Sequence, residues 1–401
     1  DVGRVRSCQY TVTGDIAVSL NAVRSEIETK GLLREVETDC PDPCFAVDIG
    51  TTTVVVYLIN GGKIIDIESR INAQKSYGDD VITRINFTMQ DPDGMHILHR
   101  AIHTQIEEMK RVLCARNSVC PEETAVAGNT TMLHLYADIS PAGIGVAPFT
   151  PAFTALKRIG KTALLPSISG YVGADTVAAI LASGMHLSGD VMLLIDIGTN
   201  GEIALGSKNG IVTCATAAGP AFEGAQIACG VGGVSGAINS IKITDKDHIG
   251  YTTIDNLPPI GICGSAILDA VAEMLKAGII DETGYFEDEE LTIAEGVYIN
   301  DQDIRQVQLA KAAIAAGIRT LLAESGIGLA DIRTCYLAGG FGSKLNRRSA
   351  CAIGLIPKEL EDKIRPIGNA AGMGAVLWQI SNRCKREMEE IIGLCRYFEL
   401  S

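Results

Sequence analysis

The chain has 401 residues, of which 47% are hydrophobic and 20% charged, and its formal net charge is −14 at pH 7. This length is enough for two or three domains with their own cores. The acidic balance argues against a face that binds nucleic acid phosphates, because such binding depends on clustered Lys and Arg. No stretch of about 18 residues lacks polar side chains, so we expect no membrane-spanning helix, no signal peptide and a cytoplasmic location.

The cysteines number twelve and are spread along the whole chain. The closest two are Cys40 and Cys44, and no CxxC pair occurs, which argues against a zinc ribbon or a CxxC redox site. Several others lie in apolar or glycine-rich runs, where cysteine is typically a small buried residue. We therefore expect a reduced cytosolic protein with mostly structural thiols.

The first 44 residues differ from the rest of the chain. They contain an expected strand at 10–20 and a charged, helix-like segment from Ser25 to Glu35. The sequence DCPDPC at 39–44 predicts a linker, because its two prolines exclude regular structure. We interpret residues 1–44 as a linker or the remnant of a preceding domain.

Strands and helices alternate after this linker. The apolar run VMLLIDIG at 191–198 predicts a fully buried strand, and TCYLAGGFG at 334–342 predicts a strand that enters a glycine turn. Helical patterns occur at 174–185, 264–278 and 303–326. This alternation predicts an α/β architecture.

A short motif occurs twice, as VDIGTTT at 47–53 and as IDIGTNG at 195–201. After each copy come an apolar run, a turn containing glycine and another strand, so the motif occupies the same place in two β-hairpins. We infer a duplicated fold with a first half at 45–188, a second half at 189–367 and a C-terminal connecting helix at 368–401 that returns to the first half.

Each copy places a carboxylate, a glycine and hydroxyl groups at a hairpin tip. Gly50 and Gly198 allow close approach to the backbone, whose N–H groups, with the Thr hydroxyls, can donate to phosphate oxygens. Asp48 and Asp196 suit a phosphate site only if Mg²⁺ lies between them and the phosphates, usually through waters. An ordinary polar turn is the alternative, which the second copy weakens. The hairpin residues expected to hold the nucleotide and its metal are Asp48, Gly50, Thr51, Thr52, Thr53, Asp196, Gly198, Thr199, Asn200 and Gly201.

The paired hairpins, the strand followed by GGFG at 339–342 and the late GNAAGMGA at 368–375 resemble the ATPase superfamily of acetate and sugar kinases, Hsp70 and actin. The resemblance implies an α/β fold of two ribonuclease H-like halves with a nucleotide cleft between them. It also implies that Gly339, Gly340 and Gly342 bring the backbone close to adenosine; a packing turn is the alternative. A Walker motif is absent, and GGFG lacks the GxGxxG spacing of a dinucleotide site.

A narrower resemblance rests on five segments in order: AVAGNTTMLHL, GYVGADTVAAILASGM, AAGPAFEGAQIACGV, GICGSAILDAVAEML and LAGGFGSKLN. Together they resemble the C-terminal ATPase domain of the reductive activators of corrinoid-dependent enzymes. The resemblance implies that ATP with Mg²⁺ is coupled to one-electron reduction of inactive cob(II)alamin in a corrinoid methyl-transfer protein. Full-length members carry a plant-type [2Fe-2S] domain whose cysteine spacing is missing here. We therefore expect no iron–sulfur cluster within this chain: either the domain that carries it was removed, or a separate protein supplies the electron.

Hydrolysis also needs a group that orients the attacking water. Asp175 begins a helix just before the second hairpin, where related sugar kinases have a base; the alternative is a helix cap. Glu223, in GPAFEG, is the second candidate, and a turn cap is its alternative. Asn129 and Thr130 follow an apolar strand, where sheet ligands commonly bind, so they face the γ-phosphate or satisfy the loop backbone.

Three other functions stay open. A small-molecule kinase on the same fold needs a substrate pocket near Asp175. A nucleotide-gated interaction module binds without turnover. An activator of the acyl-CoA dehydratase type uses a [4Fe-4S] cluster between two subunits, for which the candidate ligands are Cys214, Cys229 and Cys263. The sequence leaves open whether the chain forms a homodimer.

Overall fold

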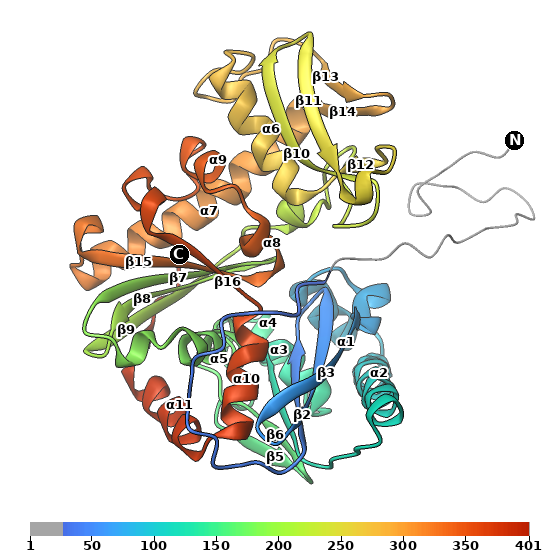
Figure 1. Cartoon of the computed structure of the whole chain (residues 1–401), viewed down its shortest axis with the longest axis vertical. Coiled ribbons are helices and arrows are strands. Elements are labelled where there is room, and N and C mark those ends of the chain that lie inside the picture. The colour runs from blue at the N-terminus through green and yellow to red at the C-terminus, as the bar shows by residue number, and fades with distance from the viewer. Residues whose placement is uncertain (1–26, 401) are drawn as a thin grey trace, which may run out of the picture.

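The computed structural model describes residues 27–400, so the strand expected at 10–20 lies outside the described residues. Two six-stranded sheets dominate the molecule (Figure 1), and five strands have the same order in both. The first sheet runs β3-β2-β1-β4-β6, with β5 beside β6, and the second runs β9-β8-β7-β15-β16, with β17 beside β9. The duplicated α/β fold predicted from the repeated motif is therefore confirmed.

In each sheet the first three strands form an antiparallel meander, and the next two run parallel to the first strand. The first sheet contains β1 (Cys44–Ile49), β2 (Thr53–Asn60), β3 (Lys63–Ile71), β4 (Thr124–Gly128), β5 (Lys157–Ile159) and β6 (Thr162–Leu164). The second contains β7 (Val191–Ile197), β8 (Gly201–Ser207), β9 (Gly210–Thr216), β15 (Ile332–Ala338), β16 (Ile364–Gly368) and β17 (Cys395–Tyr397). The apolar runs of β1 and β2 are almost entirely buried, as continuous apolar strands in a covered sheet should be.

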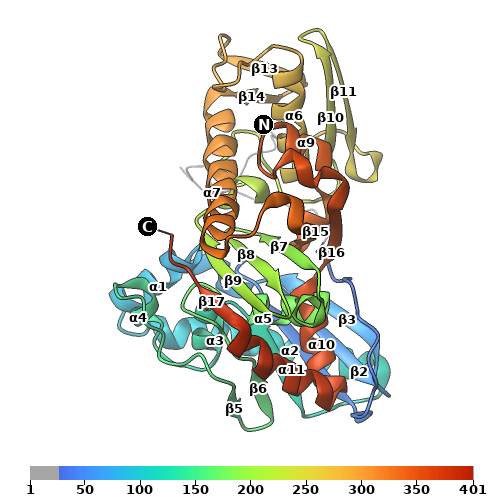
Figure 2. The same ribbon diagram turned by 90° about the vertical axis from the view of Figure 1, so that its left-hand side faces the viewer.

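The helices of the first half are η2 (Ala73–Tyr77), α1 (Val81–Gln90), α2 (Gly94–Asn117), α3 (Thr130–Tyr136), α4 (Ala142–Gly145), α5 (Ala174–Ser183) and η3 (Met185–Leu187). Those of the C-terminal part are α8 (Gly339–Lys344), α9 (Arg347–Ala352), η7 (Lys358–Lys363), α10 (Ala370–Ile380) and α11 (Asn382–Leu394). After α11 the chain returns to the second half, where β17 pairs with β9 at the sheet edge (Figure 2). No described helix is long and apolar enough to span a membrane.

The segment between β9 and β15 adds a smaller layer that stands above the second sheet in Figure 1. It contains η4 (Pro220–Glu223), β10 (Ala237–Asp245), β11 (His248–Thr253), η5 (Ile254–Asn256), β12 (Gly261–Ile262), α6 (Gly264–Lys276), β13 (Glu290–Ala294), β14 (Val297–Asn300), α7 (Asp301–Ser325) and η6 (Leu329–Asp331). Helix α7 begins at a capping box in which Asn300 and Asp303 satisfy each other's backbone N–H groups. This layer and the outer face of the second sheet share one core.

Helices α5 and α10 lie side by side between the two sheets (Figure 1). They belong to one core cluster with the first sheet and with Leu194 and Ala204 of the second. The helices approach so closely that a Cβ at Gly374 of α10 would lie 2.0 Å from the carbonyl oxygen of Ala178 in α5. Glycine is therefore required where the two helices connecting the halves cross.

Residues 27–43, which we call the strap, form an extended segment along one side of the molecule (Figure 1). Leu32 N–H donates to the carbonyl of Ile367 (2.9 Å), and Asn369 N–H donates to the carbonyl of Lys30 (2.9 Å). The helix expected from Ser25 to Glu35 is therefore wrong for its described part. Its charged residues favour a helix locally, but pairing with the end of β16 satisfies the backbone instead.

The segment after β15, for which we expected a glycine turn, is the start of a helix. Gly339, Gly340 and Gly342 form the first turn of α8 instead of a loop. Gly339 has φ +82°, which an L side chain rarely adopts. This conformation lets the chain pass directly from the strand into the helix.

Candidate nucleotide site

The two repeated motifs lie at equivalent hairpin turns, one between β1 and β2 and one between β7 and β8. Each turn closes with a short backbone hydrogen bond: Gly50 N–H to the Thr53 carbonyl (2.8 Å), and Gly198 N–H to the Asn200 carbonyl (3.0 Å). Thr51, Thr52 and Thr199 occupy the tips, and Gly201 begins β8. The prediction that both copies of the motif lie at hairpin turns is therefore confirmed, whereas their binding of phosphate stays a prediction.

Glu223 joins the two tips. Its Oε2 accepts a hydrogen bond from Thr52 Oγ1 (2.9 Å) and another from Thr199 Oγ1 (3.1 Å). Glu223 ends the short helix η4, which is continued by Gly224 at φ +80°. One carboxylate oxygen thus connects a hydroxyl of the first half to a hydroxyl of the second, and the halves meet at the predicted phosphate turns.

Four carboxyl groups gather behind these tips, from Asp48 on β1, Asp175 on α5, and Asp196 and Glu202 on β7 and β8. Asp196 and Glu202 are directly opposite in the antiparallel register, so their side chains point to the same face. Each of the four residues keeps some solvent exposure although protein surrounds its carboxyl group. The four residues form a partly exposed acidic cluster, which we call the recess.

Burial is the main reason why the pKa values of these four carboxyl groups are raised. It raises the pKa of Asp48 and of Asp196 to about 7 and that of Asp175 to about 6, and it raises the pKa of Glu202 well above its usual value. The charge of Asp175 raises the pKa values of the other three further. Asp175 is therefore electrostatically coupled to both hairpins, which a helix cap alone would not require. In the first turn of α5 its Oδ1 accepts the N–H of Thr176 (2.7 Å).

The donor set of this recess fits a divalent cation held together with phosphates. Among residues 27–400 no three His, Cys, Asp or Glu side chains are placed to bind a metal directly. Mg²⁺ at nucleotides is typically bound by one or two carboxylates, phosphate oxygens and waters, so Asp48 and Asp196 fit this role. Asp48 is oriented by Asn369, whose Nδ2 donates to Asp48 Oδ2 (2.9 Å). A Cβ at Gly339 would lie 2.5 Å from Asp196 Oδ1, so glycine there leaves room for this carboxylate.

The first turn is supported from below by three polar side chains. Arg84 is fully buried, and its Nη2 donates to the Thr51 carbonyl (2.6 Å). Asn72 Nδ2 donates to the Gly50 carbonyl (2.8 Å), and Asn129 Nδ2 donates to Thr51 Oγ1 (3.1 Å). Two turn carbonyls are therefore bonded away from the tip, which suits a turn that presents N–H groups to an anion.

The two predicted residues after β4 have different surroundings. Asn129 is the N-cap of α3 and contacts the first turn, as just described. Thr130 is buried, and its Oγ1 donates to the Ser169 carbonyl (2.6 Å). A Cβ at Gly173, just before α5, would lie 2.5 Å from Asn129 Cα, so the start of α5 is packed against this corner. Asn129 and Asp175 are thereby brought to the same end of the first sheet.

The GGFG segment lies next to the recess through Gly339 and next to the strap through Gly340. A Cβ at Gly340 would lie 3.6 Å from Glu28 Cβ, and Ser343 Oγ donates to Glu28 Oε2 (2.9 Å). The ring of Phe341 stacks on that of Phe222 at a centroid distance of 4.8 Å. The contact of these glycines with adenosine stays a prediction.

Sequence reasoning missed Glu202, Asn369 and Arg84. Glu202 could have been found, because a hairpin turn at 198–200 pairs residue 196 with residue 202. Asn369 stood within the GNAAGMGA segment, but only the fold shows that it reaches Asp48. Arg84 lies in an amphipathic helix in which an arginine normally suggests the solvent side, so no local signal marks it as buried.

Substitution of Glu223 tests the connection between the tips. In Glu223→Ala both hydroxyls lose their common acceptor, and we expect ATP affinity to fall about tenfold, since a hydrogen bond to a charged group contributes roughly 1.5–3 kcal/mol. Glu223→Gln keeps an oxygen acceptor and should lose less. Isothermal titration with ATP and Mg²⁺ measures both variants, and equal losses would argue against a bridging role.

Comparisons with known proteins cover nearly the whole described chain. The model described as the RACo middle region matches residues 44–188, and the model for the C-terminal domain of RACo, the ASKHA domain, matches residues 190–401. The corrinoid activation enzyme RamQ of Eubacterium limosum is 34% identical over 406 aligned residues, which cover 90% of this chain and 66% of that protein. The [Co(II) methylated amine-specific corrinoid protein] reductase of Methanosarcina barkeri is 29% identical over 51% of this chain and 42% of its own.

A solved structure agrees with these matches. The reductive activator for corrinoid, iron-sulfur protein is 36% identical, with a TM-score of 0.81 over 91% of this chain and 64% of its own. The chain thus spans slightly less than two thirds of this structure and of RamQ. Because the two family models together match it from residue 44 to its last residue, the chain belongs to the RACo family, whose middle region and ASKHA domain it contains.

Proposed function

We propose that this chain binds and hydrolyses ATP with Mg²⁺ and uses the cycle to activate a corrinoid protein whose cobalt is in the inactive cob(II)alamin state. The observation that carries the proposal is that both hairpin tips are hydrogen-bonded to Glu223, which brings the two copies of the duplicated motif together and supports one phosphate site between them. The relatives named as corrinoid activation enzyme and corrinoid protein reductase support the choice of partner.

The roles of the residues follow from their positions. The N–H groups of the turns at 50–53 and 198–201, together with those hydroxyls that do not donate to Glu223, donate to phosphate oxygens. Asp48 and Asp196 hold the cation, which neutralises phosphate charge when bound. Asp175 orients the attacking water and accepts its proton, and Glu223 holds the two tips at one separation.

Coupling to the corrinoid partner is a shift between conformations. The nucleotide contacts both halves, so it binds more tightly when the two hairpin turns lie close together (closed) than when they are apart (open). It shifts the equilibrium toward the closed arrangement by the difference between these two binding free energies. We propose that the closed form binds the corrinoid protein and changes the coordination of its cobalt. One electron, from a separate protein or from a domain outside this sequence, then converts cob(II)alamin to cob(I)alamin.

The raised pKa values predict a pH dependence of nucleotide binding. Asp48 and Asp196 have pKa values of about 7, so they are largely protonated at pH 6 and largely ionised at pH 8. A cation binds to the ionised carboxylates. Affinity for ATP with Mg²⁺ should therefore rise between pH 6 and pH 8, by about tenfold for each carboxylate whose ionisation is required. Titration calorimetry in buffers of different ionisation enthalpy should detect proton release at pH 6.5, and its absence would contradict the assignment.

The proposed function is tested by ATP hydrolysis with Mg²⁺, with and without a corrinoid protein held as cob(II)alamin. Hydrolysis that the corrinoid protein stimulates, together with a cob(I)alamin spectrum when an electron donor is added, supports the activator. Brisk hydrolysis that no corrinoid protein changes, with phosphate transferred to a sugar or carboxylate, would instead identify a kinase. Tight binding without turnover would identify a nucleotide-gated module.

A further inference from the structure

Two cysteines that the nucleotide site does not use meet at the surface of the first half. Cys114 lies in the last turn of α2, and Cys120 lies in the loop between α2 and β4. Their Sγ atoms are 2.6 Å apart, with the Cys114 thiol as donor. Cys120 is exposed, whereas Cys114 packs partly against the first core. One thiol is therefore open to a reagent in solution, and the other lies directly behind it.

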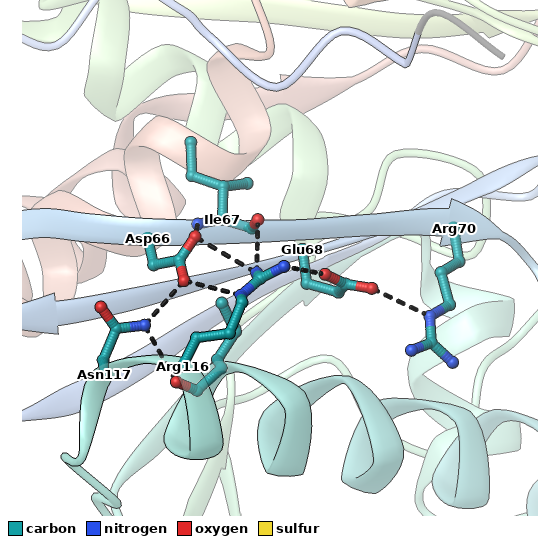
Figure 3. Close-up of polar contacts among 7 residues, drawn as sticks. Asp66, Ile67, Glu68, Arg70, Arg116 and Asn117 are labelled. Atoms are coloured by element: carbon teal, nitrogen blue, oxygen red, sulfur yellow. Dashed lines mark hydrogen bonds and ion pairs between the residues drawn. The ribbon is translucent and has the colours of Figure 1, made fainter. Parts of the chain in front are cut away.

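The turn that carries this pair is fixed by an ion-pair and hydrogen-bond network (Figure 3). Arg116 Nε donates to Asp66 Oδ2 (2.9 Å), and Arg116 Nη1 pairs with Glu68 Oε2 (3.1 Å) on β3. Asn117 Nδ2 donates to the same Asp66 oxygen (2.6 Å). Ser118 then reverses the chain with φ +56°, its N–H donating to the Cys114 carbonyl (2.8 Å). Arg116 and Asn117 thus tie the turn to β3 and hold it in the shape that brings Cys120 back to Cys114.

We propose that Cys114 and Cys120 are a redox-active thiol pair that forms a reversible disulfide by exchange with low-molecular-weight disulfides. This site is separate from the nucleotide site and does not depend on the proposed function. Cys120 is the attacking residue because it is exposed, whereas Cys114 packs partly against the first core. Burial, and then the hydrogen bond to Cys120, raise the pKa of Cys114 to about 11, so Cys114 reacts second.

The reaction balances in two steps. The Cys120 thiolate attacks one sulfur of the small disulfide, breaks its S–S bond and releases one thiolate, leaving a mixed disulfide on Cys120. Cys114 then loses its proton to solvent, attacks Cys120 Sγ and expels the second thiolate. Two protein thiols are oxidised to a disulfide, and one small disulfide is reduced to two thiols.

The other cysteine pair suggested by sequence spacing does not have this geometry. Cys44 is buried in β1, and Cys40 Sγ contacts Asp39 Oδ1 and Lys385 Nζ. Cys40 therefore serves as the control for a partly exposed thiol outside the pair.

The test is incubation of the full chain with oxidised glutathione at pH 8, alkylation of the remaining thiols and peptide mass spectrometry. We expect an intramolecular Cys114–Cys120 disulfide that dithiothreitol reverses. Cys114→Ser should stop at a glutathione adduct on Cys120, and Cys120→Ser should leave Cys114 at least about tenfold slower to react, because its thiol is partly buried. Cys40→Ser should leave the product unchanged. Free thiols at both positions, or a stable adduct on Cys120 in the unmodified chain, would overturn the proposal.

A second variant separates the pair from the turn that holds it. Arg116→Ala removes the contacts with Asp66 and Glu68 but keeps both thiols. We expect the first step to keep its rate and the closing step to slow several-fold, so that the adduct on Cys120 accumulates. Arg100→Ala, an exposed arginine of the same helix paired with Asp93, is the matched control and should change neither step. Equal closing rates in the two variants would show that the network does not pre-organise the pair.

Discussion

Asp175→Asn is expected to lower the kcat of ATP hydrolysis by about 10²- to 10³-fold and to leave the Kd for ATP with Mg²⁺ within a few-fold of its original value. The carboxyl group lies in the first turn of α5 and is electrostatically coupled to Asp48, Asp196 and Glu202. With a pKa raised to about 6, it is mostly ionised near pH 7.5 and can accept a proton from water. Steady-state hydrolysis and nucleotide titration measure the two quantities separately.

The pH–rate profile of this variant gives a second measurement. In the unmodified chain, kcat should fall as the pH is lowered through about 6, because the Asp175 carboxylate then takes up a proton. Asp175→Asn should remove this fall from the profile. Asp301→Asn is the matched control, because Asp301 is an exposed aspartate in the first turn of another helix, α7. A similar loss of kcat in both variants would assign the effect to helix starts in general and not to the site.

Gly374→Ala is expected to destabilise the folded protein by about 3 kcal/mol. The added Cβ would lie 2.0 Å from the carbonyl oxygen of Ala178, a backbone atom that cannot move aside as a flexible side chain would. Helices α5 and α10 must therefore separate, and with them the two halves that they connect. Chemical denaturation followed by circular dichroism measures the loss, and ATP affinity should fall with it.

Gly393→Ala on the neighbouring helix α11 is the control. A Cβ at that position meets no atom within 4 Å, so alanine should instead stabilise the helix by about 0.5–1 kcal/mol through its better propensity. Opposite signs for the same substitution on adjacent helices would locate the effect in the α5–α10 crossing. A neutral Gly374→Ala would show that the helices can move apart at no cost.

The repeated hairpins could be predicted because their signal is local. A buried strand, a carboxylate and a glycine turn lie within seven residues, and the second copy at 195–201 repeats the pattern at equivalent positions. The alternating strands and helices likewise followed from apolar runs and helical periodicity. These features depend on neighbours in the chain, which a sequence shows directly.

The parts that sequence reasoning missed depend on distant neighbours. Arg84 is buried where the carbonyl of Thr51, 33 positions earlier in the chain, accepts its Nη2. Residues 27–35 have charged side chains typical of a helix, yet pairing with residues 367–369 holds their described part extended. Cys114 and Cys120 approach each other because β3 holds the turn between them. In each case the deciding partner lies outside the window in which local propensity operates.

The strap is bonded to both halves at once. Its Thr29 carbonyl accepts the Tyr57 hydroxyl (2.9 Å) of β2, while Glu28 accepts Ser343 Oγ of α8 and Gly31 forms a bridge with Gly368. It therefore links the two halves directly, and a rotation of one half relative to the other would have to stretch, break or exchange these bonds. In the closure that we propose for the nucleotide cycle, movement of the halves would therefore displace the strap itself.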